Sequence, residues 1–324
     1  MENNNALTAV VVLNYNNAAA TRNCIESIKK YNTAKVKFVV IDNASREDEY
    51  KALRDMMHDE FGGDCPLYDK DHTPSSEILP EAVLIRSDEN LGYARGNNLG
   101  LEYIYKDPEV THLLIINNDI LFVQDLIPEF LTAKAILPES AIITPLLLRK
   151  DGKGIDYNCA RRQIKFSEII AKHFTFYLGR IFKKKSSVNS DRYLISNLTD
   201  TNTPQAIQLP SGSCMFIEKH YFQNIESFDP NTFLYQEENI LYEKIKRTGK
   251  INYLLPYLKC IHLGSETISE VPNQVKIMKL AMESEEYFVM TYLNPNIFQK
   301  CLYKFSKTFF LCTFRIQKFL YHKK

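Results

Sequence analysis

An apolar run that ends abruptly in polar side chains constrains the fold more than any other feature of this sequence. Residues 113–116 are wholly apolar, and Asn117, Asn118 and Asp119 follow at once. Such a run, bounded by polar residues, is typical of a strand buried on both faces of a parallel sheet. Because open α/β sheets bind ligands beyond the carboxyl ends of their strands, Asp119 is predicted to lie where a ligand binds. Its carboxylate could hold Mg²⁺ or Mn²⁺ there, and a simple Asn-Asp turn is the alternative.

Similar runs precede this one, with helical segments between them. Strands are predicted at residues 7–13, 36–41 and 83–86, and helices at 21–30, 46–60 and 90–105, with Thr21 as the cap of the first helix. A further strand is predicted at 141–148, and residues 61–80 are expected to form a loop. This alternation predicts right-handed βαβ units and a mostly parallel, mixed sheet flanked by helices, which is the α/β class.

Composition excludes several classes of protein. The chain has 324 residues and a net charge of +1, so it has no general attraction for nucleic acid and no nucleic-acid partner is expected. Its 7 cysteines are scattered, without C-x-x-C spacing, which favours reduced thiols in the cytoplasm and argues against a disulfide framework or a zinc site. With neither a signal-peptide core nor a long apolar stretch, we expect a chain that is not exported and does not span a membrane.

Clusters of Asn and Asp follow three of the first four predicted strands, at residues 14–17, 42–43 and 117–119. Three such endings at one edge of a sheet favour a ligand with hydroxyl groups and phosphates, and a nucleotide fits this description. No G-x-G-x-x-G follows the first strand, which argues against a dinucleotide-binding dehydrogenase.

Four ordered motifs resemble those of the family 2 inverting glycosyltransferases, in particular the rhamnosyltransferase-like branch. They are VVVLNYNN at residues 10–17, VVIDNAS at 39–45, NLGYARGNNLG at 90–100 and LLIINND at 113–119. The resemblance covers about residues 7–265 and implies the GT-A fold. It implies a catalytic domain at 1–265, with a nucleotide-sugar half at 1–120 and an acceptor half at 121–265. Residues 266–324 are then a helical C-terminal extension.

The resemblance implies a donor site for a nucleoside-diphosphate sugar, with a UDP- or dTDP-linked sugar favoured. Its residues are Asn14, Tyr15, Asp42, Gly92, Arg95, Asn98, Asn117 and Asn118. In this interpretation Asp42 binds the base or ribose, and Arg95 could offset diphosphate charge with its fork of donors. The alternatives are that Asp42 forms a turn and that Arg95 is a solvated helix residue.

The resemblance also implies a divalent cation, Mg²⁺ or Mn²⁺, as the cofactor. The family's D-x-D motif appears here as Asn117-Asn118-Asp119, so Asp119 is the single expected carboxylate ligand. His262 ends another apolar run, where the family often has a histidine near the metal, and its imidazole could supplement Asp119. A structural histidine is the alternative.

Glu237 and Glu238 resemble the family's acidic pair at the start of a helix that faces the acceptor. An inverting transfer needs one carboxylate to take the proton of the attacking hydroxyl group. Glu238 aligns with the family's base, and Glu237 is the second candidate. A later aspartate of the pattern is Ile240 here. The alternative is that both glutamates only favour the helix N-terminus.

Two segments combine basic and aromatic residues, 161–185 and the predicted C-terminal helix from 296 onward. In that helix the lysines are expected on one face and Phe305, Phe309 and other apolar residues on the opposite face, as in a helix that lies on an anionic membrane surface. Packing on the catalytic domain or on a partner subunit is the alternative. We expect a peripheral protein on the inner face of the cytoplasmic membrane.

The sequence therefore predicts a metal-dependent transferase of the hexosyltransferase class. It would move a sugar from a nucleoside-diphosphate sugar to a hydroxyl group of a lipid-linked glycan, in cell-surface polysaccharide synthesis. One alternative is a nucleotide-sugar pyrophosphorylase, but residues 14–20 contain neither the glycine nor the basic residue of a phosphate loop. The other is a non-catalytic nucleotide-sugar-binding scaffold, which Asn117 and Ile240 would explain.

Overall fold

The computed structural model describes residues 6–62, 65–69, 72, 76–181, 201–264 and 274–321. Its elements are β1 (Leu7–Asn14), α1 (Ala18–Tyr31), β2 (Val36–Asp42), α2 (Glu47–Phe61), β3 (Leu67–Tyr68), β4 (Ala82–Arg86), α3 (Gly92–Ile104), β5 (Val110–Asn117), β6 (Ile120–Phe122), α4 (Ile127–Ile136), β7 (Ser140–Arg149), η1 (Tyr157–Cys159), β8 (Ala160–Arg161), α5 (Phe166–Ile181), β9 (Gln205–Ile207), β10 (Leu209–Pro210), β11 (Cys214–Glu218), α6 (Lys219–Asn224), α7 (Glu237–Thr248), β12 (Ile251–His262), α9 (Gln274–Tyr292) and α10 (Ile297–Tyr321).

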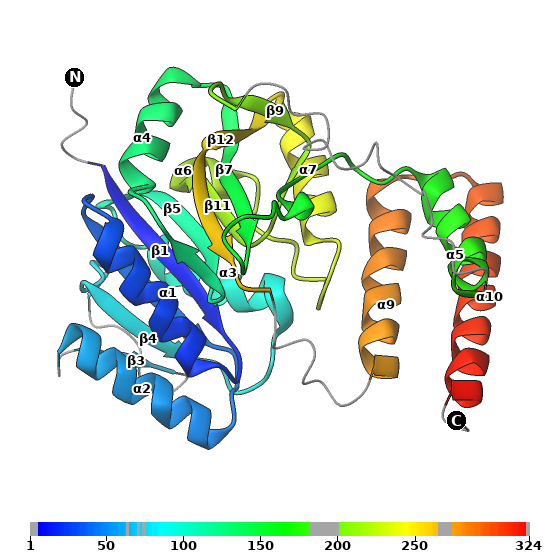
Figure 1. Cartoon of the computed structure of the whole chain (residues 1–324), viewed down its shortest axis with the longest axis horizontal. Coiled ribbons are helices and arrows are strands. Elements are labelled where there is room, and N and C mark those ends of the chain that lie inside the picture. Colours follow the sequence, from blue (N-terminus) through cyan, green and yellow to red (C-terminus); the bar gives the residue numbers. More distant parts are fainter. Residues whose placement is uncertain are drawn as a thin grey trace.

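The main sheet is mixed and mostly parallel, as predicted. Its strand order is β3-β4-β2-β1-β5-β11-β7-β12-β6, with β9 paired to β12. Strands β3, β4, β2, β1 and β5 are parallel neighbours, whereas β11 runs antiparallel between β5 and β7. The βαβ half thus comes from the first part of the chain, and the later strands extend the same sheet (Figure 1).

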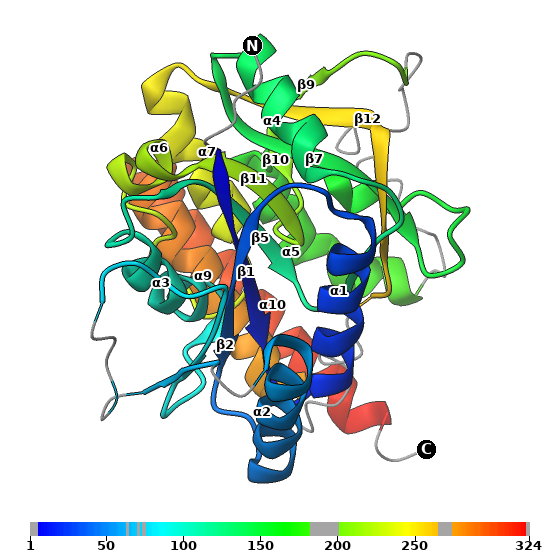
Figure 2. The ribbon, with the colours of Figure 1, turned by 90° about the vertical axis from the view of Figure 1, so that its left-hand side faces the viewer.

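Helices cover both faces of the sheet because the side chains of each strand alternate between two cores. Val10 and Val12 of β1 belong to a core that α1, α2 and α4 complete, whereas Ala9 and Val11 face α3, α6 and α7. Figure 2 shows β1 between α1 and α3. All four of these side chains are fully buried, and burying one valine stabilises the fold by about 1.5–3 kcal/mol. The unbroken apolar runs of the sequence follow from this burial on both faces.

The register of the strands brings their polar ends to one edge. Asn14 lies opposite Asp42 in the β1–β2 pair, and Leu13 lies opposite Asn117 in the β1–β5 pair. The first helix begins earlier than predicted, because Asn17 rather than Thr21 caps it and accepts a hydrogen bond from the backbone N of Ala20 at 3.1 Å.

Helices α5, α9 and α10 lie side by side next to the sheet (Figure 1). Their shared core includes Ile169 of α5, Phe288 of α9 and Tyr303 of α10, and Ile240 of α7 joins it. Ile240, where the family pattern has an aspartate, thus packs these helices against α7. None of the described helices has the length and apolar content needed to cross a membrane.

Neither the basic nor the aromatic face predicted for the last helix is the face that packs inward. Tyr303, Ser306 and Phe310 face inward, whereas Phe305 lies outward with Lys304, and its side chain is 64% exposed. The inward face of α10 includes polar residues because Tyr303 and Ser306 form buried hydrogen bonds with Glu285 and His173, respectively. The side chains of 176–185 and 316–324, which belong to the two basic and aromatic segments, lie outside the described residues.

Candidate active site

A network of polar side chains closes the carboxyl ends of β1, β2 and β5. Asn14 Nδ2 donates to Asp42 Oδ1 and to Ser45 Oγ, at 3.2 Å each. Asn14 Oδ1 accepts from Thr21 Oγ1 at 2.9 Å and from Asn118 Nδ2 at 3.4 Å. The predicted donor residues Asn14, Asp42 and Asn118 therefore lie together and hold one another in place.

Asn14 and Asp42 are fully buried. Burial raises the pKa of Asp42, although hydrogen bonds within the network act against the increase. Because the amide of Asn14 is already hydrogen-bonded at both atoms, this residue supports the strand ends, and its predicted contact with a base is not available in this structure. Tyr15, Asn117 and Asn118 at the same edge are only half buried, so they are more accessible to a ligand than Asn14 and Asp42 are.

Gly92 allows a close approach of two backbone segments. It begins α3 with φ +75°, and a Cβ at this position would lie 2.1 Å from the carbonyl O of Phe233. Only glycine fits both conditions. The backbone N of Tyr93 donates to the same carbonyl at 3.0 Å. The predicted close approach to the donor is here an approach to the protein's own chain, just before α7.

Arg95 and Asn98 lie outside the polar network. Arg95 is exposed, and its Nη2 lies 3.5 Å from Glu89 Oε1, as expected for a solvated helix residue. Asn98 binds the backbone of Phe228 with both amide atoms, at 2.8 and 3.3 Å. Asn98 thus fixes the segment that leads to α7 instead of facing the strand ends.

Asp119 and His262 lie next to each other because β6 pairs with the end of β12. His262 Nε2 is 3.3 Å from Asp119 Oδ2, and His262 Nδ1 is 2.7 Å from Asp156 Oδ2. Burial alone would lower the pKa of His262, but the hydrogen bonds and charges of the two carboxylates raise it to about 9. The structure thus places both predicted metal ligands at one point.

These residues fit a divalent cation. Asp119 Oδ1 is buried and has no hydrogen-bond partner, and Oδ2 has only the ion pair with His262 at 3.3 Å, so a cation could complete the coordination of this carboxylate. Asp156 lies behind His262, as carboxylates do that orient a metal-binding imidazole. The described residues include no group of three His, Cys, Asp or Glu that could hold an ion on their own. An ion at Asp119 and His262 would therefore need oxygens from the substrate and from water, which is common for Mg²⁺.

Glu237 and Glu238 occupy the first turn of α7, as predicted, but their surroundings differ. Glu237 is buried, and burial together with the charge of Glu238 raises its pKa to about 8. It is therefore mostly protonated at neutral pH and cannot take a proton from an acceptor. Of the pair, Glu238 is the residue that lines a cavity.

Glu238 is held at one of its two carboxylate oxygens. Arg161 Nη2 and the backbone N of Gly212 each lie 3.2 Å from Glu238 Oε1. The other oxygen, Oε2, is thus the one that can receive a proton. Tyr235 and Gln236, just before α7, both have left-handed φ values, of 70° and 74°, and such strained backbone often occurs at functional sites.

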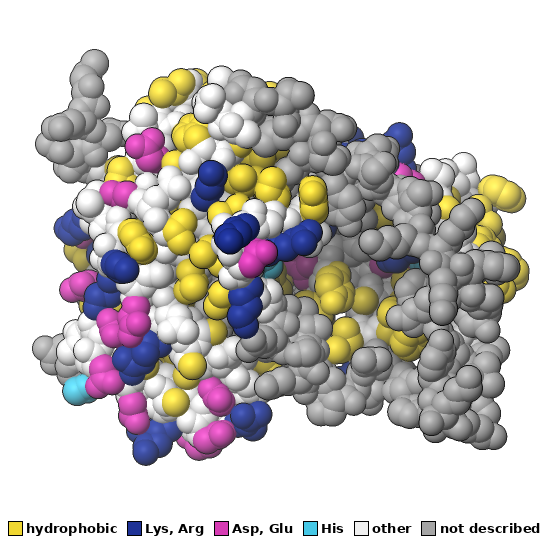
Figure 3. Space-filling model, in the orientation of Figure 1, with side chains coloured by type: hydrophobic (Ala, Val, Ile, Leu, Met, Phe, Trp, Pro, Cys, Tyr) yellow, Lys and Arg dark blue, Asp and Glu magenta, His cyan; other side chains and the backbone are white. Residues whose placement is uncertain are grey.

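The cavity beside Glu238 has a volume of about 510 Å³, within the usual range of ligand pockets. His262, Ser211 and Arg161 line it together with Glu238, and the opposite wall comes from α5, α9 and α10. Figure 3 shows a hollow between the sheet and these helices, in which hydrophobic side chains gather. The predicted base and a predicted metal ligand therefore face one space.

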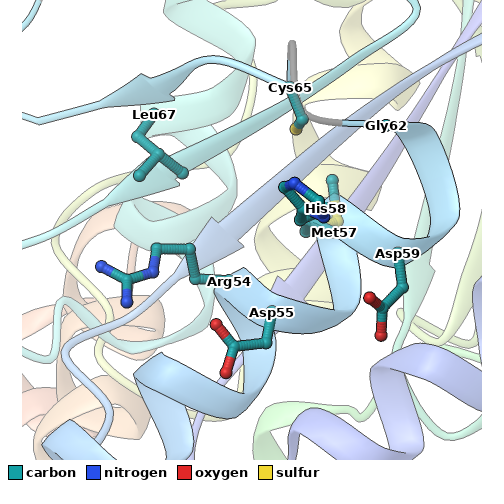
Figure 4. Close-up of a pocket in the computed structure, with 8 residues that line it drawn as sticks. All are labelled: Arg54, Asp55, Met57, His58, Asp59, Gly62, Cys65 and Leu67. Carbon is teal, nitrogen blue, oxygen red and sulfur yellow. The ribbon is translucent and has the colours of Figure 1, made fainter.

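A second cavity, of about 400 Å³, lies between the end of α2 and β3. Arg54, Asp55, His58 and Asp59 of α2 line one side of it (Figure 4). None of the predicted site residues is among its lining residues, so we assign it no part in the reaction.

Sequence reasoning missed three contacts of the site, those of Asp156, Arg161 and Gly212. Asp156 and Arg161 belong to the poorly patterned segment 151–206. They meet His262 and Glu238 across 106 and 77 residues of sequence, respectively. No local pattern could have revealed these partners.

The fold is that of the GT-A glycosyltransferases. GalNAc-T7, solved with UDP, GalNAc and Mn²⁺, matches 94% of this chain with a TM-score of 0.58 at 14% identity, over 55% of its own length. The mannosyltransferase PcManGT of Pyrobaculum calidifontis, solved with GDP-Man and Mn²⁺, matches with a TM-score of 0.54 at 14% identity, over 72% of its length. Residues 1–349 of TarS of S. aureus match with a TM-score of 0.50 at 10% identity, over 80% of that chain.

The chain belongs to glycosyltransferase family 2. The family model described as Glycosyl transferase family 2 matches residues 9–195, which is more than half of the chain. A curated relative is the N-acetylglucosaminyl-diphospho-decaprenol L-rhamnosyltransferase of Mycobacterium tuberculosis (strain CDC 1551 / Oshkosh). It is 23% identical over 211 aligned positions, and the match covers 62% of this chain and 66% of the relative. The chain thus spans just under two thirds of the relative's length.

Proposed function

We propose that this protein transfers a sugar from a nucleoside-diphosphate sugar to a hydroxyl group of a glycan, with inversion at the anomeric carbon. The observation that carries the proposal is the single cavity shared by Glu238 and His262, with Asp119 beside His262. A base and a cation-binding pair on one space suit a direct displacement, in which one group activates the acceptor and the other faces the leaving diphosphate.

In the proposed reaction, Glu238 Oε2 takes the proton of the acceptor hydroxyl group as its oxygen attacks the anomeric carbon. The bond to the nucleoside diphosphate breaks on the opposite side, which inverts the configuration. Asp119 and His262 would hold a divalent ion, which when bound supplies positive charge to the departing diphosphate. Protonated Glu237 adds no second negative charge beside the base.

The finer parts of the proposal concern the substrates. A UDP- or dTDP-linked hexose is favoured as the donor, and a lipid-linked glycan of cell-surface polysaccharide synthesis as the acceptor. Support comes from the M. tuberculosis relative, whose name specifies a sugar linked to decaprenol through a diphosphate, and from solved neighbours that contain UDP or GDP-Man with Mn²⁺.

The test is the release of nucleoside diphosphate by the purified chain. UDP-, dTDP- and GDP-sugars are compared with Mn²⁺ and with a chelator, and binding of each donor is followed by calorimetry. We expect one donor to bind and to release its nucleoside diphosphate only with the metal. If no donor binds under either condition, the assignment of the site is wrong.

We also propose that the protein contacts the inner face of the cytoplasmic membrane through α10. Ile297, Phe298 and Phe305 are exposed large apolar side chains, with exposed fractions of 78%, 73% and 64%. Lys300 and Lys304 are exposed along the same helix. Aromatic residues enter the lipid interface, and each nearby lysine adds about 1 kcal/mol of attraction to an anionic surface.

Vesicle flotation tests this contact. With vesicles that contain anionic lipid, replacing Phe298 and Phe305 by serine is expected to reduce the bound fraction about tenfold or more, because the apolar area that enters the lipid is lost. The matched control is Ile136→Ser, since Ile136 is 71% exposed but belongs to α4. Equal flotation of all variants would contradict the proposal.

A further inference from the structure

The two walls of the cavity beside Glu238 differ in chemistry. The wall from the catalytic part of the chain is polar, with Glu238, Ser211 and His262. The opposite wall is largely apolar, and it includes Met278 and Met282, which lie one helical turn apart on α9. Methionine side chains are flexible and adapt to apolar chains of irregular shape. A ligand that fills this space is polar at one end and apolar at the other.

Two cations line the cavity, one on each wall, and both have unused hydrogen-bond donors. Arg161 reaches Glu238 through Nη2, and its buried Nε has no partner. Lys172 of α5 is about half exposed, and its Nζ lies 3.4 Å from Glu285 Oε2. A guanidinium has five N–H donors and an ammonium has three, so both groups can bind further oxygens. An anion with several oxygens suits this pair better than a neutral group does.

Glu285 is held by partners other than Lys172. His173 Nε2 lies 2.7 Å from Glu285 Oε1, and Tyr303 donates to the same oxygen at 3.3 Å. His173 Nδ1 also lies 2.9 Å from Ser306 Oγ, which ties α5 to α10. Burial would raise the pKa of Glu285, but the hydrogen bond with His173 and the charge of Lys172 lower it. This buried network fixes α5 against α9 and α10, and so positions Lys172 at the cavity.

We propose that this cavity binds a prenyl diphosphate, with Arg161 and Lys172 on the diphosphate and the α9 methionines on the first prenyl units. The inference rests on the proposed function, because the sugar linked to that diphosphate would be the acceptor presented to Glu238. One of the helices that form this apolar wall is α10, whose exposed residues Phe298 and Phe305 belong to the proposed membrane surface. A lipid chain that leaves the cavity past α10 would therefore meet that surface.

The test uses the full chain with saturating UDP and Mn²⁺, which fill the donor site. Farnesyl diphosphate, inorganic pyrophosphate and farnesol are then titrated by calorimetry. We expect farnesyl diphosphate to bind at least about tenfold more tightly than the other two, because it alone satisfies both walls. Equal binding of pyrophosphate would mean an anion site only, and equal binding of farnesol an apolar pocket only; either result overturns the proposal.

Variants assign the contacts. Lys172→Gln is expected to weaken farnesyl diphosphate binding about fivefold or more, and Lys172→Arg to retain it, because arginine keeps the charge. Lys279→Gln is the matched control, since Lys279 is an exposed lysine of α9 outside the lining residues. Met278→Ser is expected to weaken farnesyl diphosphate but not pyrophosphate. If Lys172→Gln binds like the unmodified chain, the proposal is wrong.

UDP binding in the same preparation separates this inference from the proposed function. If UDP binds with Mn²⁺ and farnesyl diphosphate does not, the prenyl diphosphate site is wrong and the transferase function stands. If neither UDP nor another nucleoside diphosphate binds, the proposed function fails and this inference fails with it.

Discussion

Replacing Glu238 by glutamine is expected to reduce kcat for sugar transfer by a factor of about 10²–10⁴, the usual contribution of a general base. The amide keeps the size of the side chain but cannot take a proton from the acceptor. The Kd of the donor sugar is expected to stay within about twofold, because base catalysis acts only on the chemical step. Single-turnover kinetics and donor calorimetry measure the two quantities separately.

Glu237→Gln is the matched control, an identical change one residue away. Because Glu237 is already mostly neutral at pH 7, turnover is expected to change only a few-fold. A transfer rate that falls with Glu237→Gln and persists with Glu238→Gln would exchange their roles.

The unmodified chain and the Glu237→Gln variant are also expected to differ in how their stability depends on pH. The folded-state pKa of Glu237, about 8, lies above the value of 4.5 for an exposed glutamate, so its favourable contribution is complete at low pH and is lost as the pH rises toward 8. Relative to Glu237→Gln, the free energy of unfolding of the unmodified chain is expected to fall by about 3 kcal/mol between about pH 5 and pH 7.5. Urea unfolding at several pH values measures this difference.

Asp119→Ala is expected to abolish the metal-dependent part of nucleoside diphosphate release, with a loss of at least about 10²-fold. Asp119 provides the buried carboxylate, whose Oδ1 has no hydrogen-bond partner, and His262 alone is a weak site for a hard cation. Calorimetry of UDP with and without Mn²⁺ gives a second readout. The increase in UDP affinity that Mn²⁺ causes in the unmodified chain should be absent in Asp119→Ala.

Asp156→Asn is the graded control for this prediction. It leaves both proposed ligands in place and removes only the charge behind His262 Nδ1. A loss of about 10–100-fold in metal affinity is expected, and higher Mn²⁺ should restore activity. Metal-stimulated release that survives in Asp119→Ala would show that the ion, if used, is held elsewhere.

Much of the fold was predictable because unbroken apolar runs and helical segments alternate along the first half of the chain. The edge where Asn14, Asp42 and Asn117 meet was predictable for the same reason, since parallel strands align their carboxyl ends. Periodicity cannot say whether a polar side chain at that edge faces a ligand or its neighbours. Asn14 is saturated by its neighbours, and only the three-dimensional contacts reveal this.

Where the structure differs from the sequence predictions, the cause is again a three-dimensional contact that local patterns do not encode. Arg95 lies on the solvent side of α3, and its position depends on how far that helix is rotated, which its motif does not specify. The face of α10 that packs inward includes Ser306 and Tyr303, because Glu285 and His173 require hydrogen-bond partners within the helical core. A count of apolar residues does not identify the face of that helix that packs inward.

The exposure of α10 also has a consequence for the cysteines, because the thiols on this helix are accessible to reagents and most of the others are not. Cys301 and Cys312 on α10 are exposed, whereas Cys24, Cys159, Cys214 and Cys260 are buried in the sheet and its flanking layers. Burial raises the pKa of the Cys24, Cys159 and Cys260 thiols, to about 12 for Cys159, so these three form little of the reactive thiolate. An alkylating probe will therefore modify the last helix first, and a fluorophore attached there tests the proposed contact with a lipid surface without any engineered residue.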